Sequence, residues 1–91
     1  MSAKTLKLEG VLNIARVEKL HSEFEELEKN SAPLVIDVKD VTRVDTSVLQ
    51  LFVALFKSMS GLGVEVSWAG ASDEFKAAAE LLGVTNVLGL D

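Results

Sequence analysis

Two adjacent hydroxyl residues follow an aspartate where an apolar strand pattern gives way to a helical one, in the segment Val44-Asp45-Thr46-Ser47-Val48. The first N–H groups of a helix have no partner within the helix, and the helix dipole places partial positive charge there. Such a position can anchor a capping hydroxyl or carry a phosphate. The chemistry expected of Thr46 and Ser47 is therefore capping, phosphate acceptance or contact with a partner.

The helix that follows is predicted over residues 47–59, and its two sides differ in composition. Spaced at 100° per residue, the side expected in the core carries Val48, Leu49, Phe52, Leu55, Phe56 and Met59, with Leu51 and Val53 at its borders. The opposite side carries Ser47, Gln50, Ala54, Lys57 and Ser58. A merely solvated helix would carry more charge on that side, so the pattern favours docking against another protein. A helix packed inside a homo-oligomer, or a plainly apolar surface, is the alternative.

The rest of the chain alternates between strand and helix patterns. Strands are expected at residues 6–12, 34–38 and 64–68, with a short last strand at 87–88. A first helix is expected from Ile14 to Leu27, and a third between the N-cap Ser72 and Gly83. The near-continuous apolar run at 34–38 is typical of a strand buried on both faces of a parallel sheet. The prediction is one α/β domain over residues 1–91, with a mostly parallel four-stranded sheet and about three helices.

Composition limits the classes of function. The 91 residues suffice for one core, and the absence of cysteine removes disulfides and thiolate chemistry. A net charge of −5 opposes contact with nucleic acid, and no apolar run has the length of a membrane span. With alternating strand pattern starting directly after the first four residues, a secretory leader is not expected. The expected location is the cytoplasm, without direct membrane insertion.

Other polar residues give weaker indications of a site. His21 is the sole histidine and lies on an acidic helix, so neither a metal site nor a general base is expected. Asp37, Asp40 and Asp45 could be imagined around Mg²⁺, but loop and strand-end aspartates commonly bond backbone N–H groups instead. No phosphate-binding loop, dinucleotide glycine motif or nucleophile with a base is present. The chain is expected to be no enzyme and to need no cofactor, and no motif indicates nucleotide binding.

The order of elements, together with the segment Asp37-Val38-Lys39-Asp40-Val41-Thr42-Arg43-Val44-Asp45-Thr46-Ser47-Val48-Leu49, resembles the STAS domain family of sulfate transporters and anti-sigma factor antagonists. The resemblance covers nearly the whole chain. It implies that Ser47 matches the serine that a partner kinase phosphorylates in the antagonists. In the STAS subunit of the bacterial lipid-asymmetry transporter, a threonine faces the partner ATPase, and Thr46 matches that threonine.

Two departures from the family pattern carry expectations of their own. Val48 stands where the family usually has glycine, and a β-branched residue there is expected to narrow access to Ser47. The antagonists also usually have an extra strand before residues 6–12. Without it, one sheet edge is expected to be open to a partner or to a second copy, which leaves a homodimer open.

Three functions follow from the resemblance. The first is a bacterial, antagonist-like regulatory domain that binds a serine kinase or anti-sigma-type protein and is switched by phosphate on Ser47, with Thr46 as second choice. The second is a constitutive subunit docked on a transporter ATPase, and the third is an accessory protein of a chemotaxis-type signalling cluster. The residues expected to contact the partner are Asp45, Thr46, Ser47, Gln50, Leu51, Ala54 and Ser58.

Overall fold

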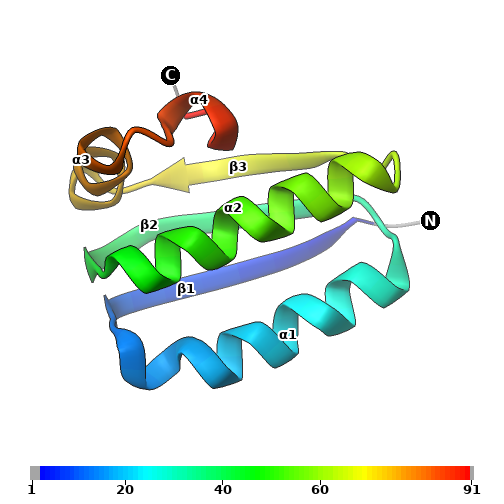
Figure 1. Cartoon of the computed structure of the whole chain (residues 1–91), viewed down its shortest axis with the longest axis horizontal. Helices are drawn as coiled ribbons and strands as arrows, with labels where there is room; N and C mark the ends of the chain where they lie inside the picture. Colours follow the sequence, from blue (N-terminus) through cyan, green and yellow to red (C-terminus); the bar gives the residue numbers. More distant parts are fainter. Residues whose placement is uncertain (1–2, 91) are drawn as a thin grey trace.

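The computed structural model describes residues 3–90 as one α/β layer structure (Figure 1). The strands are β1 (Lys4–Leu12), β2 (Leu34–Val44) and β3 (Val66–Ala71), and they form a parallel sheet in the order β1-β2-β3. The helical elements are the 3₁₀ turn η1 (Ile14–Arg16), α1 (Val17–Asn30), α2 (Thr46–Gly61), α3 (Asp73–Leu82) and α4 (Thr85–Leu88). The α/β class and the parallel sheet are as predicted, whereas the described residues contain three strands and four α-helices rather than four strands and three.

The predicted last strand at residues 87–88 is wrong, because this segment is the helix α4. The N–H of Leu88 donates to the carbonyl of Val84 at 3.0 Å, and Gly89 ends the turn with a φ of 67°. The indole Nε1 of Trp68 donates to the carbonyl of Leu88 at 2.7 Å and fixes α4 beside β3. Two neighbouring apolar residues are too short a pattern to distinguish a strand from one helical turn.

The first helix does not begin with Ile14 as predicted. Asn13 accepts a bond from the N–H of Ala15 at 3.1 Å and opens a 3₁₀ turn, after which α1 starts at Val17. This tighter turn shifts Ile14 out of phase with the buried residues Leu20 and Phe24, and Ile14 is 72% exposed. Its side chain is therefore surface, not core.

Both crossovers of the sheet run in the same direction, so α1 and α2 cover the same face (Figure 1). Leu34, Ile36 and Val38 point into the core beneath these helices, while Val35 and Asp37 are only half-buried. The strand is therefore buried on one face, not on both as its apolar run predicted. β2 also continues beyond 38 to Val44, because β1 pairs with it past two register shifts.

The core is centred on Phe52 of α2, whose side chain is fully buried. Its ring centroid lies 5.1 Å from that of Phe24, 5.5 Å from that of Phe75 and 5.9 Å from that of Trp68. These rings come from α1, α3 and β3, so one side chain joins four elements. This aromatic cluster fixes α2, and with it the turn that precedes α2, relative to the sheet.

Candidate functional site

The turn between β2 and α2 lies at the edge of the sheet where all three strands end (Figure 1). The N–H of Asp45 donates to the carbonyl of Leu12 at 2.9 Å, which ties the turn to the end of β1. The N–H of Ser72 donates to the carbonyl of Val38 at 3.1 Å and ties the start of α3 to β2. In open parallel sheets this edge is where binding sites form, because loops from neighbouring strands meet there.

Asp45 is the N-cap residue of α2, but its carboxylate makes no capping bond. Its carbonyl accepts from the N–H groups of Val48 and Leu49 at 3.0 and 3.1 Å, which begins the helix. One carboxylate oxygen, Oδ1, instead lies 3.7 Å from Nε of Arg43, an exposed residue of β2. The Asp45 side chain thus accepts no bond from the N–H groups of Ser47 and Val48, the positions that an N-cap side chain usually serves.

The two hydroxyl residues have opposite environments. Thr46 is exposed at the start of α2. The Oγ of Ser47 exposes less than 1 Å² and has no hydrogen-bond partner in the structure. The residue that the family resemblance matches to the phosphorylated serine therefore has its oxygen inside, and Thr46 is the exposed residue of the two.

Access to Ser47 is limited by a different cause from the one predicted. Val48 was expected to crowd the surface beside Ser47, but its side chain is fully buried in the core. Helix periodicity directs residues 47 and 48 about 100° apart, so the bulk of Val48 lies away from the surface. The burial of the Ser47 hydroxyl itself limits access.

We predict that Ser47→Ala leaves the domain as stable as the parent or more stable, by about 1 kcal/mol, because a buried hydroxyl without a partner carries a desolvation cost. Chemical denaturation monitored by circular dichroism measures this difference. Thr46→Ala serves as the comparison on the exposed neighbour. A loss of stability beyond about 1 kcal/mol in Ser47→Ala would show that its Oγ makes a bond absent from this structure.

The outward side of α2 has the small, weakly polar surface that the sequence predicts. Gln50, Ala54 and Lys57 are exposed, and Leu51 and Ser58 are half-buried. None of the seven residues predicted to contact a partner belongs to the buried class. From here on, the α2 docking surface denotes Asp45, Thr46, Ser47, Gln50, Leu51, Ala54 and Ser58.

Sequence reasoning missed an apolar hollow next to this surface. Its volume is about 180 Å³, and its lining residues are Val44, Thr46, Leu49, Ala78, Leu81 and Leu82. Leu81 on α3 is 92% exposed, the highest value among the exposed large apolar side chains of the described chain. Its helical spacing could have indicated this, because Leu81 lies off the stripe formed by Phe75, Ala79 and Leu82.

The remaining polar candidates lie apart from this site. On α1, His21 Nδ1 is 3.6 Å from Glu25. A carboxylate oxygen of Asp37 accepts the N–H of Lys39 at 3.1 Å, and Asp40 lies 3.5 Å from Lys7. Across residues 3–90 no three acidic, histidine or cysteine side chains are grouped as a metal site would require. Nor does any helix of that range have the length and apolarity to cross a membrane.

The chain belongs to the STAS domain family, since the family model described as "Mlab, STAS domain" matches residues 1–89. This confirms the family that the residues around Asp45 indicated. The fold is similar to the crystal structure of a Thermotoga maritima protein that is described as an anti-sigma factor antagonist, with a TM-score of 0.81. The two sequences are 18% identical, and the match covers 94% of this chain and 75% of that one.

A second solved structure, that of Mglu, is similar with a TM-score of 0.64 and 20% identity. This likeness covers 76% of the present chain but only 17% of Mglu. No curated protein sequence matches the chain significantly. At identities of 18% and 20%, both comparisons show a similar fold and nothing further.

Proposed function

We propose that this chain is a non-enzymatic protein-interaction domain that binds its partner through the α2 docking surface and the adjoining Leu81. The observation that carries the proposal is the placement of a largely exposed leucine beside an exposed threonine, at a helix face with almost no charge. Exposed apolar groups in such a setting favour burial against another protein. The proposal places the domain in the cytoplasm and assigns it no cofactor.

The partner proposed first is a serine kinase or anti-sigma-type protein, because the fold is similar to that of a protein described as an anti-sigma factor antagonist. In this version, phosphate on Ser47 would add about −1.5 to −2 charge beside Asp45 and repel a partner fitted to the neutral surface. The buried Oγ of Ser47 means that a kinase would have to open the first turn of α2. This requirement makes the switch a second step that is separable from docking.

A transporter ATPase is the second candidate partner, and two observations favour it. The family model that matches is the Mlab type, and the exposed hydroxyl is that of Thr46. A threonine that docks without modification needs only to be accessible. Gene neighbours would separate a sigma-factor operon, an ABC transporter operon and a chemotaxis cluster.

The test is co-expression of the chain with the partner found in its gene neighbourhood. We expect the pair to co-purify, and we expect Thr46→Glu to weaken binding at least tenfold, because a carboxylate replaces a neutral contact beside Leu81. A negative charge at the start of a helix is tolerated, so the circular dichroism spectrum should not change. Undiminished binding by the folded Thr46→Glu variant would sink the proposal.

Intact-mass spectrometry of the same co-purified chain tests the switch separately. A phospho-switch requires one added phosphate that disappears in Ser47→Ala and persists in Thr46→Ala. An unmodified chain that still co-purifies keeps the docking surface and eliminates the switch.

A further inference from the structure

The outer edge of β1 is protected against pairing with another strand. The N–H of Lys4 donates to the carbonyl of Pro33, the residue before β2, so by the alternation of a parallel ladder the groups of residues 5 and 7 point outward. Nη1 of Arg16 lies 3.3 Å from the carbonyl of Glu9 and 3.4 Å from that of Val11, and accordingly covers two outward acceptors. Two register shifts interrupt the strand as well. Covered acceptors and irregularities are devices that prevent strand addition.

The outer edge of β3 is less protected, because its one register shift comes after Trp68 and no side-chain hydrogen bond among residues 3–90 reaches the backbone of Val66 or Trp68. The N–H of Leu34 donates to the carbonyl of Glu65, and Leu34 is paired with Val66, so the backbone groups of Val66 and Trp68 point away from β2. No backbone group among residues 3–90 accepts from these two N–H groups. The strand Val66–Ala71 contains no charged residue and no proline. An unpaired neutral edge of this kind is a template for another strand.

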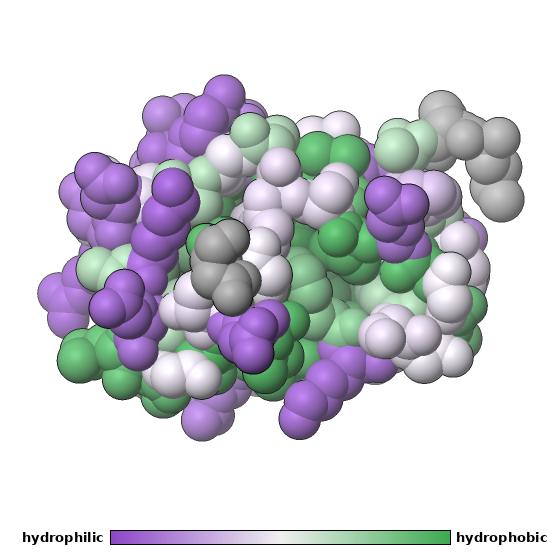
Figure 2. All heavy atoms as spheres, turned by 90° about the horizontal axis from the view of Figure 1, so that it is seen from above, coloured by the Kyte–Doolittle hydropathy of each residue, from purple (hydrophilic) through white to green (hydrophobic). Residues whose placement is uncertain are grey.

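Space for another segment exists along this edge. A hollow of about 490 Å³ lies between Val66, Ser67 and Trp68 on one side and residues 86–89 on the other. A second hollow of about 480 Å³ continues from it and is lined by Phe56, Lys57, Ser60, Val64, Val66 and Val87. Seen from the side of β3 and α4, hydrophobic atoms line a hollow near the centre of the face, with hydrophilic and intermediate residues around it (Figure 2).

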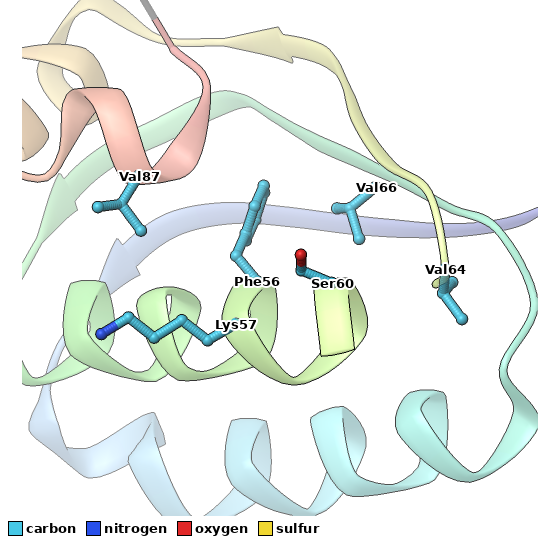
Figure 3. A pocket seen from close by; sticks show the side chains of 6 residues that line it. All are labelled: Phe56, Lys57, Ser60, Val64, Val66 and Val87. Carbon is cyan, nitrogen blue, oxygen red and sulfur yellow. The ribbon is translucent and has the colours of Figure 1, made fainter. Parts of the chain in front are cut away.

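The walls of this groove combine apolar side chains with a few polar ones, and one cation lies at the rim. Phe56 stands between Val87 of α4 and Val66 of β3, and its ring is stacked on that of Trp68 with centroids 5.4 Å apart (Figure 3). Val87 is 47% exposed. Lys57 is the charged residue among those lining the two hollows, and it has no ion-pair partner within 4.0 Å in the described chain.

We propose that the β3 edge and this groove bind an extended segment of a partner protein in which apolar residues alternate with at least one carboxylate. The backbone of the segment pairs with the outward N–H and C=O groups of Val66 and Trp68, as in β-strand addition. Its apolar side chains contact Phe56 and Val87, and its carboxylate faces Lys57. Because Lys57 is near the opposite end of α2 from Thr46, the inference does not rest on the proposed function.

A library of displayed random twelve-residue peptides, selected on the full chain, tests the proposal. We expect enriched peptides to alternate apolar residues and to contain Asp or Glu. Amide exchange measured by NMR on the chain with one enriched peptide should slow at Val66 and Trp68. Peptides that protect the β1 edge or residues 45–47, that bind as helices, or that lack acidic residues would overturn the proposal, as would the absence of any enriched peptide.

Two variants sharpen the test. Lys57→Glu should weaken binding of the enriched peptide at least tenfold and should change the selected charge to Lys or Arg, whereas Lys29→Glu on α1 should do neither. Val66→Pro removes an outward N–H while leaving the ladder with β2 intact, and should abolish binding. If Val66→Pro alters the circular dichroism spectrum, Lys57→Glu and its control decide. Equal binding by the folded Val66→Pro variant and the parent would overturn the strand-addition geometry.

Discussion

Replacing Phe52 with alanine should lower the free energy of unfolding by about 3–5 kcal/mol, which is the usual range for removing a buried aromatic side chain. Phe52 is fully buried, and the rings of Phe24, Phe75 and Trp68 all have centroids within 5.9 Å of its own. Aromatic pairs contribute about 0.5–1.5 kcal/mol beyond their buried area, so a loss near the upper end of the range is expected. Urea denaturation followed by circular dichroism measures the change.

A matched change on the opposite side of the same helix separates packing from helix propensity. Gln50 is exposed, and alanine is the better helix former, so Gln50→Ala should leave stability within about 0.5 kcal/mol of the parent. A midpoint for Phe52→Ala as high as that of Gln50→Ala would mean that the two sides of α2 are assigned the wrong way round.

The sequence predicts most of the fold where a periodic pattern is long. The faces of α2 are largely correct because its pattern extends over four turns, and Val48, Leu49, Phe52, Leu55 and Met59 are buried as expected. Phe56, which was expected in the core as well, is only half-buried. The C-terminal end of β2 could not be predicted from the sequence. Pairing with β1 determines where the strand ends, and the types of the residues after Val38 do not. The same limit applies to residues 87–88, where bonds to neighbouring turns decide between helix and strand.

The candidate site is predictable in position but not in accessibility. The segment around Asp45 has the composition of a strand-to-helix turn, and the structure places it at the edge where the strands end. Which hydroxyl faces solvent depends on the rotation of the first helical turn and on the packing around it. That information comes from tertiary contacts, so Ser47 was predicted to face outward although its Oγ is buried. The contribution of Leu81 likewise depends on how α3 lies against α2.

Leu81→Lys should weaken binding of the native partner at least tenfold without loss of stability. Leu81 is 92% exposed beside Thr46, so its side chain adds little to the folded monomer and is free to enter an interface. A lysine at this position would lose the burial of the apolar side chain and bring a charge that has to be desolvated, and about 1.4 kcal/mol corresponds to a tenfold loss of affinity. Lysine in the last turn of a helix interacts favourably with the dipole, so α3 should remain folded.

Leu62→Lys is the matched control, because it places the same substitution at another exposed leucine. Leu62 is 54% exposed and follows the C-terminal end of α2, opposite the end that carries Thr46. Titration calorimetry with the purified partner should give parent affinity for Leu62→Lys and a reduced affinity for Leu81→Lys. Equal affinities for the two variants would remove Leu81 from the interface. A reduced affinity for Leu62→Lys alone would contradict the prediction, because partner binding would then depend on Leu62 at the C-terminal end of α2 and not on Leu81.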